Sequence, residues 1–331
     1  MKKTLIALAA VAATGAAFAQ STVTLSGKYA FAYTATDTDN AAIAGGTKTN
    51  GFGTTDGDVV FAAVEDLGGG LKASADMALR LRGRGDANGR DAKIALSGGF
   101  GRLVGGTIEA GNGIIGRASA GAPTIGLDNK IGLDAPANVD WLAYYTPAMN
   151  GFVASVQIVD SVGTPAAGGL QNAALTLDGT VVGVTYDAGP LSVGADYTSF
   201  GKNSAVPTAP ALGVTKSRVR VSASYNLGVA TVGAGYQTKD NTAGGADNEQ
   251  WMLGVSAPLG AITVGATMAH HDGGNGFGLD GVEVKSYELG ANYAFSKRTS
   301  LQAAYQSMDV DVNGAHGSKD TAFRVRLMHA F

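Results

Sequence analysis

The chain contains no cysteine, and after its first residues it has no apolar run long enough to cross a bilayer as a helix. The missing cysteines exclude disulfides, thiolate metal sites and cysteine nucleophiles. A spanning helix needs about 20 predominantly apolar residues, whereas the longest apolar stretches here are interrupted by Gly, Ser, Thr or a charge every few positions. The chain is mildly acidic and shows no basic run or basic face, so nothing indicates a nucleic-acid partner.

The start of the chain has the pattern of a secretory signal peptide. Two lysines precede the apolar stretch Leu5–Phe18, and Ala17–Ala19 has the small residues of a cleavage site. A membrane helix is the alternative, but the stretch is short for one and no stop-transfer charges follow. We expect residues 1–19 to be removed, so that the mature chain begins at Gln20. It would carry 24 − 2 = 22 basic residues against 27 acidic ones, a net charge of about −5.

From Thr22 onward, the segments between polar connections alternate apolar and polar residues, the period of a β-strand with two different faces. The clearest example is 71–82, in which Leu71 and Met77 share one face while Lys72 and Arg80 share the other. Sixteen such segments follow one another, and tight turns alternate with longer, polar, Gly-rich loops. The loops include 37–56 and 83–90, so the second segment is predicted at about 58–65, the fourth at about 91–97 and the last at 321–331 after another loop. Gly is abundant, 50 of 331 residues, as many turns would require.

This pattern fits two kinds of β-protein. In a soluble sandwich the apolar faces would pack a dry core. Three features favour a membrane barrel instead: the alternation of short and long connections, segments of about 10 residues, and aromatic residues near the segment ends. We therefore predict an all-β protein, a 16-stranded antiparallel up-and-down transmembrane β-barrel formed by a single domain, 20–331. Its apolar face would meet lipid and its polar face would surround water.

The connection 111–138 is the longest in the sequence. A structureless connection of this length inside a compact domain is usually functional. Within it, Gly111–Gly116 matches G-x-G-x-x-G, but 117–126 has no helical stripe, which argues against a dinucleotide site.

Two other groups of polar residues could suggest chemistry. His270, His271 and Asp272 lack a third metal ligand at suitable spacing, and we expect a surface histidine pair at a strand end. Ser97, or His270 with Asp272, could belong to a barrel enzyme, but neither sits in a recognisable catalytic constellation. No metal, cofactor or enzymatic activity is therefore predicted.

Five pieces of the sequence, in this order, resemble the general diffusion porins of Gram-negative outer membranes, especially the β-proteobacterial branch. They are Glu65–Ala73, Leu96–Leu103, Tyr145–Phe152, Tyr293–Thr299 and Arg326–Phe331. The similarity covers essentially the whole mature chain. It implies short periplasmic turns, long external loops, and a third external loop, 111–138, that folds back into the lumen and narrows it.

The resemblance also implies the partners of the protein. These are two further copies in a homotrimer, the lipids and lipopolysaccharide of the outer membrane, and the barrel assembly machinery, which reads a C-terminal Phe such as Phe331 as an insertion signal. Small hydrophilic solutes and ions would pass through the channel.

In such porins, basic residues on the barrel wall face acidic residues of the third loop. The basic candidates on the wall are Lys28, Lys72, Arg80, Arg82, Arg218, Arg220, Arg324 and Arg326. The candidates in and beside the loop are Glu109, Arg117, Asp128 and Asp134. The loop opens with Ile108–Gly113 where relatives have a Pro-Glu-Phe-Gly-like sequence, so the match of its acidic positions is inexact.

Arg80 and Arg82 are the strongest of these candidates, because neighbours on one face of a strand project into the same water about 6.6 Å apart. Inward basic residues outnumber inward acidic ones, which predicts a passive channel with a weak preference for anions. A substrate-specific porin, a barrel enzyme and a purely structural barrel are the alternatives.

Overall fold

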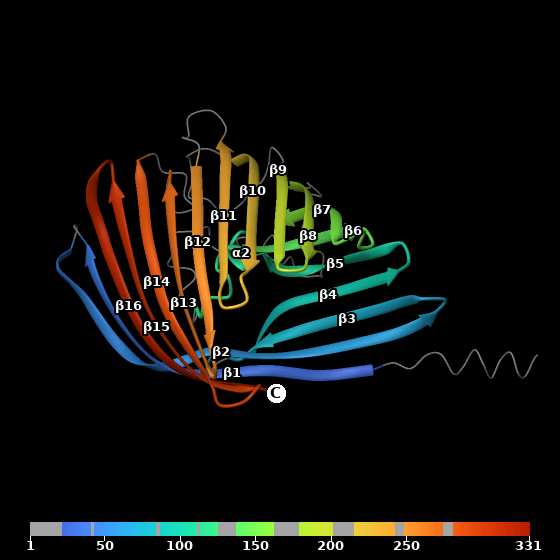
Figure 1. Cartoon of the computed structure of the whole chain (residues 1–331), viewed down its shortest axis with the longest axis horizontal. Coiled ribbons are helices and arrows are strands. Elements are labelled where there is room, and N and C mark those ends of the chain that lie inside the picture. Colours follow the sequence, from blue (N-terminus) through green and yellow to red (C-terminus); the bar gives the residue numbers. More distant parts are fainter. Residues whose placement is uncertain are drawn as a thin grey trace, which may run out of the picture.

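The computed structural model is a closed barrel of antiparallel strands (Figure 1). It describes residues 22–40, 43–83, 87–110, 113–124, 137–161, 179–200, 215–241, 248–273 and 281–331. The predicted signal peptide lies outside this part of the chain.

The first eight strands are β1 (Thr22–Asn40), β2 (Ile43–Gly68), β3 (Leu71–Arg80), β4 (Asn88–Gly98), β5 (Gly101–Ala110), β6 (Ala137–Tyr145), β7 (Phe152–Ser161) and β8 (Gly179–Ala188). The other eight are β9 (Leu191–Phe200), β10 (Thr215–Asn226), β11 (Thr231–Asn241), β12 (Asn248–Leu259), β13 (Ile262–Asp272), β14 (Val282–Ala294), β15 (Thr299–Val312) and β16 (Ala315–Ala330). A short helix, α2 (Ile115–Ala118), lies between β5 and β6.

Each strand pairs with its neighbours in sequence, and β16 pairs with β1 to close the ring. Figure 1 shows the colours running around the barrel until red β16 reaches blue β1. Closure matters because an unpaired backbone group costs several kcal/mol in hydrocarbon, so a sheet that spans a membrane has no open edge. The predicted 16-stranded antiparallel barrel is confirmed.

No helix in the described part of the chain has the length and apolar character needed to cross a membrane.

The two faces of the wall differ as the alternation predicts. Large apolar side chains point outward and are exposed, for example Met77 on β3, Ile94 on β4 and Leu253 on β12. Polar side chains at inward positions, such as Gln237 on β11 and Gln250 on β12, are fully buried inside the barrel. A soluble sandwich would bury its apolar face, so this arrangement identifies the outer wall as the surface that meets lipid.

The first and last hairpins are longer than the sequence predicts. Residues 37–40 and 43–56 of the polar stretch predicted as a loop belong to β1 and β2, and β15 joins β16 through a tight turn at Asn313 and Gly314, both at positive φ. Threonines explain the first extension, because β-branched residues fit a pleated sheet and pair across it. Thr36 and Thr49, for example, face each other with their hydroxyl oxygens 2.6 Å apart. The predicted alternation of short turns and long loops therefore fails at these two connections.

The C-terminus is held at the seam between the first and last strands. The backbone N–H of Gly27 donates to the carbonyl of Phe331 at 3.1 Å, and the N–H of Phe331 donates to the carbonyl of Gly27 at 3.0 Å. The ring of Phe331 covers Gly27, where a Cβ atom would come within 2.6 Å of the ring. Glycine at position 27 therefore makes room for the last residue of the chain.

Candidate functional site

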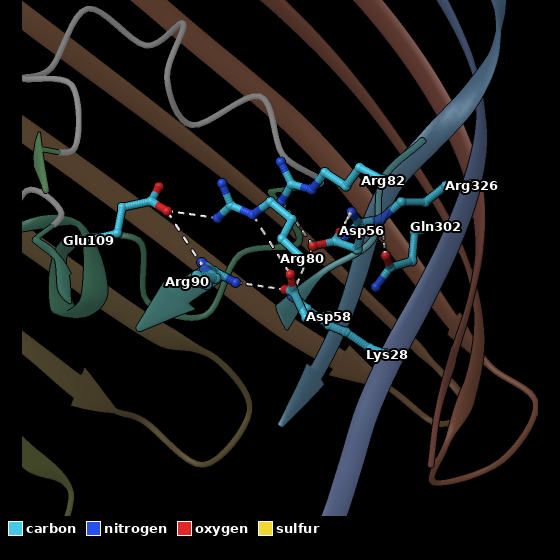
Figure 2. A network of polar contacts seen from close by, with 9 residues as sticks. All are labelled: Lys28, Asp56, Asp58, Arg80, Arg82, Arg90, Glu109, Gln302 and Arg326. Atoms are coloured by element: carbon cyan, nitrogen blue, oxygen red, sulfur yellow. Dashed lines mark hydrogen bonds and ion pairs between the residues drawn. The ribbon is translucent and has the colours of Figure 1, made fainter. Parts of the chain in front are cut away.

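Nine polar residues form a network on the inner face of the barrel, contributed by the first five strands and the last two (Figure 2). We call them the charged cluster: Lys28, Asp56, Asp58, Arg80, Arg82, Arg90, Glu109, Gln302 and Arg326. Strand register brings them together. Lys28 on β1 lies opposite Asp58 on β2, and Asp58 lies opposite Arg80 on β3.

One half of the charged cluster surrounds Asp56. Its carboxylate accepts a hydrogen bond from Arg326 Nη1 at 2.6 Å and forms ion pairs with Lys28 Nζ at 2.9 Å and with Arg82 Nη2 at 3.6 Å. Arg326 also donates from Nε to the amide oxygen of Gln302 at 2.6 Å. This half therefore ties β16 to β2, although Arg326 and Asp56 are 270 residues apart in sequence.

The other half surrounds Asp58 and Glu109. Arg90 Nη1 donates to Asp58 at 2.6 Å, and Arg80 Nη2 donates to Glu109 at 2.7 Å. Each arginine also forms a longer ion pair with the other arginine's partner: Arg80 Nε lies 3.8 Å from Asp58, and Arg90 Nε lies 3.6 Å from Glu109. Lys28 connects the two halves, because its Nζ is also 3.9 Å from Asp58.

The backbone around Gly57 explains how β3 approaches this site. The N–H of Leu81 donates to the carbonyl of Gly57 at 2.5 Å, and a Cβ on Gly57 would collide with the carbonyl of Leu81. A β-bulge at Thr55, between the pairs Ala30–Asp56 and Phe31–Thr54, re-aims the strand at this point. Strand alternation about Gly57 places Asp56 and Asp58 on the same inner face, and the glycine lets the backbone that follows β3 approach them closely.

The cations and the carboxylates of the charged cluster differ in the solvent exposure of their side chains. Lys28 and Arg82 expose 43% and 42% of their side chains, whereas Asp56 and Asp58 expose 12% and 5%. The cluster holds five cationic side chains and three carboxylates, a balance of 5 − 3 = +2. Water in the barrel therefore meets positive charge, with most of the negative charge lying behind it.

The structure brings together five of the residues singled out in the sequence: Lys28, Arg80, Arg82, Glu109 and Arg326. Sequence reasoning missed Asp56, Asp58, Arg90 and Gln302. Asp56 and Asp58 carried a usable signal, because they alternate with Gly57 and so share a strand face, but the strand was predicted to begin only at Asp58. Arg90 was missed because the region before Asp91 was predicted as a connection.

Arg117 and Arg220 lie apart from the charged cluster, near β8, β9 and β10. Arg117 Nε donates to Ser192 Oγ at 2.9 Å and its Nη2 is 3.7 Å from Asp187. Arg220 pairs with Asp196 on β9 at 2.9 Å.

The remaining candidates are distributed over the barrel. Arg218 lies over the ring of Phe200 at 5.6 Å, and Arg324 Nε donates to Thr34 Oγ1 at 3.0 Å. Lys72 is exposed near the turn between β2 and β3. Asp128 and Asp134 lie outside the described residues.

Residues 113–124 of the long connection rest against the inner wall. Ile114 and Ala118 are fully buried and pack with Met252 on β12 and Ala269 on β13. Figure 1 shows α2 beside β10 and β11. The rest of the connection up to β6 lies outside the described residues, so an inward-folded constriction loop over 111–138 stays a prediction.

The histidine pair differs from the expectation of a surface loop. Both residues belong to β13, where neighbouring side chains point to opposite faces. His271 is fully buried inside the barrel, with Nε2 2.6 Å from Asn248 Nδ2, while His270 Nε2 lies 2.8 Å from Glu283. Within the described ranges, no three His, Cys, Asp or Glu side chains gather as a metal site would require.

Comparison with known proteins identifies relatives of the whole chain. The sequence profile of the family described as "Gram-negative porin" matches residues 4–313. Outer membrane porin protein 32 of Delftia acidovorans is 30% identical over an alignment of 383 positions, which covers 100% of both chains.

Solved structures share the fold at lower identity. A loop-deletion mutant of OmpT, an outer membrane protein of Vibrio cholerae, has a TM-score of 0.65 and 16% identity, covering 94% of this chain and 99% of its own. A mutant of Rh. blastica porin has a TM-score of 0.64 and 15% identity, covering 94% and 100%.

Proposed function

The chain belongs to the Gram-negative porin family, and from this premise we propose that its channel prefers small anionic solutes over cations. The protein is a β-barrel of the outer membrane that lets small hydrophilic solutes diffuse passively. Selectivity in such a channel comes from its width and from the charges that line it. The proposal concerns the sign of that selectivity.

The observation that carries the proposal is the unequal exposure within the charged cluster. Lys28 and Arg82 face the water of the lumen, while Asp56 and Asp58 are covered by the cations that bind them. An ion in the lumen therefore meets exposed positive charge first. A low-dielectric wall focuses the field of such local charges, so they count more than the acidic net charge of the chain.

The test is a reversal-potential measurement on the purified protein in a planar bilayer under a potassium chloride gradient. We expect the sign that corresponds to faster passage of chloride. A clear preference for potassium would reject the proposed selectivity, although the protein would still be a channel.

We further propose the assignments that follow from the family. The barrel assembles as a homotrimer surrounded by outer-membrane lipid and lipopolysaccharide, and Phe331 serves as the insertion signal for the barrel assembly machinery. Residues 1–19 are removed during export, and 111–138 narrows the lumen as a constriction loop. Mass spectrometry of the mature protein tests the cleavage, and its molecular mass in detergent tests the trimer.

Family membership also favours a channel over an enzyme. We propose that the barrel catalyses no reaction of its own. Hydrolysis of ester or peptide substrates by the purified protein in detergent, abolished by substituting Ser97 or His270, would contradict this.

A further inference from the structure

A row of polar side chains crosses four neighbouring strands at the mouth of the barrel that carries the short turns. Register places Lys72 on β3 opposite Ser97 on β4, and Ser97 opposite Arg102 on β5. Arg102 in turn lies opposite Tyr145, the last residue of β6. We call these four residues the mouth row. Neighbouring strands lie about 4.8 Å apart, so the backbones of Lys72 and Arg102 are about 10 Å apart.

Strand alternation shows that the mouth row faces the lumen. On β5, Leu103 is 43% exposed on the outer face and Val104 is buried on the inner face, so Arg102 projects inward. On β3, Met77 is 60% exposed on the outer face, and the residues at even positions, Lys72 among them, project inward. Both cationic side chains are exposed, and the water that reaches them is that of the lumen.

Within the part of the chain that the structure describes, Lys72 and Arg102 have no carboxylate oxygen within 4 Å. All five cations of the charged cluster, by contrast, form ion pairs with carboxylates. Asp66 lies opposite Lys72 on β2, but it accepts a hydrogen bond from the N–H of Gly68 at 2.9 Å and so stabilises the turn. The positive charge of the mouth row is therefore open to a ligand.

The mouth row is separate from the charged cluster. Lys72 and Arg80 are 80 − 72 = 8 residues apart on β3, about 27 Å along the strand. This is well beyond the Debye length of about 8 Å at physiological ionic strength. Between them, Asp76 and Lys93 form an ion pair at 3.3 Å that adds no net charge. An anion at the mouth row therefore interacts with the row and is screened from the cluster.

The chemistry of the mouth row suits an anion with several acceptor oxygens. An ammonium group has three donors and a guanidinium group has five, neither has an acceptor, and the hydroxyls of Ser and Tyr can also donate. Hydrogen bonds between charged donors and anionic oxygens are about twice as strong as neutral ones. A tetrahedral oxyanion can accept from donors on several strands at once, whereas chloride is a single acceptor atom.

We propose that the mouth row is a binding site for small oxyanions, separate from the charged cluster, that gathers them at one end of the barrel. Lys72 and Arg102 supply the charge, and Ser97 and Tyr145 supply further donors. The inference rests on the proposed channel function only for its effect on current, because an oxyanion can bind the row whether or not the barrel conducts.

The first experiment measures the electrostatic potential at the mouth row and needs no channel activity. The chain has no cysteine, so Ser97→Cys places a single thiol in the row. Negatively and positively charged methanethiosulfonates react with this thiol in detergent, and their rates are normalised to those with glutathione. The ratio of the two rates cancels any change in the acidity of the thiol, which affects both reagents alike.

We expect the negative reagent to react faster with the Ser97→Cys protein. Adding Lys72→Gln or Arg102→Gln should lower the ratio of negative to positive rates by about threefold each, as expected for the loss of one unit charge several ångströms away in water. Sodium sulfate at constant ionic strength should slow the negative reagent. This protection should disappear when Lys72 and Arg102 are both replaced by Gln.

Lys297→Gln is the control, because it removes one positive charge from the turn between β14 and β15, outside the mouth row. It should leave the ratio of rates unchanged. Heat-dependent gel mobility shows whether each variant is folded. Equal ratios in all folded variants, or sulfate protection that survives the double substitution, would overturn the proposed site.

The second experiment measures the effect on current in single-channel recordings. Sulfate is added to one chamber at a time at constant ionic strength. Because the row lies at one mouth, block of the chloride current should differ between the two chambers. The difference should vanish in the Lys72→Gln, Arg102→Gln protein and persist in Lys297→Gln. A difference that persists in the double variant would contradict the assignment to this mouth.

The two experiments separate the site from the channel. If the protein does not conduct at all, the channel proposal fails while the thiol rates still decide whether the mouth row binds sulfate. If it conducts but the thiol rates are insensitive to Lys72, Arg102 and sulfate, the site is rejected and the channel proposal stands.

Discussion

At the scale of single residues, Asp56 and Asp58 organise the basic side chains around them. Each carboxylate is nearly buried and accepts contacts from three cationic side chains. A buried carboxylate is costly unless it is paired and hydrogen-bonded, so these contacts hold the guanidinium groups in place. The arrangement leaves one face of Lys28 and Arg82 open to water, and those exposed faces are what a passing solute meets.

The substitution Arg82→Glu should move selectivity toward cations. It replaces a 42% exposed positive charge with a negative one beside Asp56, so the local charge changes by two units. We expect the reversal potential in a salt gradient to move toward the potassium equilibrium value by tens of millivolts or to change sign, since one unit charge in a narrow bore acts over about a Debye length.

Lys297→Glu is the matched control for Arg82→Glu. It makes the same change in net charge, but Lys297 lies in the turn between β14 and β15. The reversal potential of the Lys297→Glu variant should stay near that of the unsubstituted protein. Equal shifts in both variants would mean that net charge, and not the charged cluster, sets the selectivity.

Arg326→Met should destabilise the barrel, because Asp56 would lose its closest partner while staying buried. Leaving a buried group incompletely paired costs about 1–3 kcal/mol, and the remaining contact with Lys28 places the expected loss toward the lower end. Urea unfolding in detergent, monitored by tryptophan fluorescence, measures this loss in the free energy of unfolding.

The double variant Arg326→Met, Asp56→Asn supplies the comparison for Arg326→Met. Replacing both members of a buried pair is often nearly neutral. The double variant should therefore recover most of the lost stability. A loss as large as that of the single variant would indicate that Arg326 acts through packing.

At the scale of elements, the strands at the seam between β1 and β16 are longer than their local sequence patterns predict. β1 and β2 continue through the polar stretch that the sequence predicts as a loop, and β1 pairs with both β2 and β16. The last backbone hydrogen bonds of the ring join Gly27 to Phe331. Gly27 and Phe331 therefore extend by one pair a seam that already runs from Lys28–Ala330 to Asn40–Ser318.

Phe331→Ala should weaken this seam. The side chain is 49% exposed, so the loss should be about 1–2 kcal/mol, less than the about 3–5 kcal/mol of a fully buried phenylalanine. We also expect less folded protein in the outer membrane if Phe331 is the insertion signal. Heat-dependent gel mobility of outer-membrane fractions measures both the stability of the barrel and the amount of folded protein.

Leu327→Ala is the control for Phe331→Ala, on the same strand and the same outward face, with 53% of the side chain exposed. It should cost comparable stability in detergent but leave the amount of inserted protein unchanged. If both variants insert equally well, Phe331 has no special role in assembly.

At the scale of the whole molecule, the net charge of the chain and the charge of the charged cluster have opposite signs. The chain as a whole carries a formal charge of −3, whereas the charged cluster carries +2. The carboxylates of Asp56 and Asp58 lie behind their cations, so the average composition does not predict what a solute experiences. Low-dielectric walls strengthen the local field relative to distant charges.

The proposed preference for anions should therefore fall as the salt concentration rises. The Debye length is about 10 Å at 0.1 M and about 3 Å at 1 M ionic strength, so added salt screens the exposed faces of the cluster. Reversal potentials measured at the two salt concentrations give the ratio of chloride to potassium permeability. We expect this ratio to approach unity at 1 M. A ratio independent of salt would point to selection by size or by direct binding.

The barrel and its two faces could be predicted from the amino-acid sequence alone. Strand facing follows from a period of two residues, which is local, and a chain of such segments with one apolar face can satisfy its backbone in lipid only by closing. Arg80 and Arg82 were identified in the same way, because their spacing predicts a common face; in the structure β3 ends at Arg80 and Arg82 follows it.

The contacts between distant charges, and the place of residues 113–124 in the barrel, become visible only in the folded protein. Arg326 reaches Asp56 across the seam between the last strand and the first, and residues 113–124 rest on glycines from five strands. Such contacts depend on register around the whole ring, and no local pattern records the register between segments hundreds of residues apart. Burial of the carboxylates behind the cations, on which the proposed sign of selectivity rests, is a property of that register.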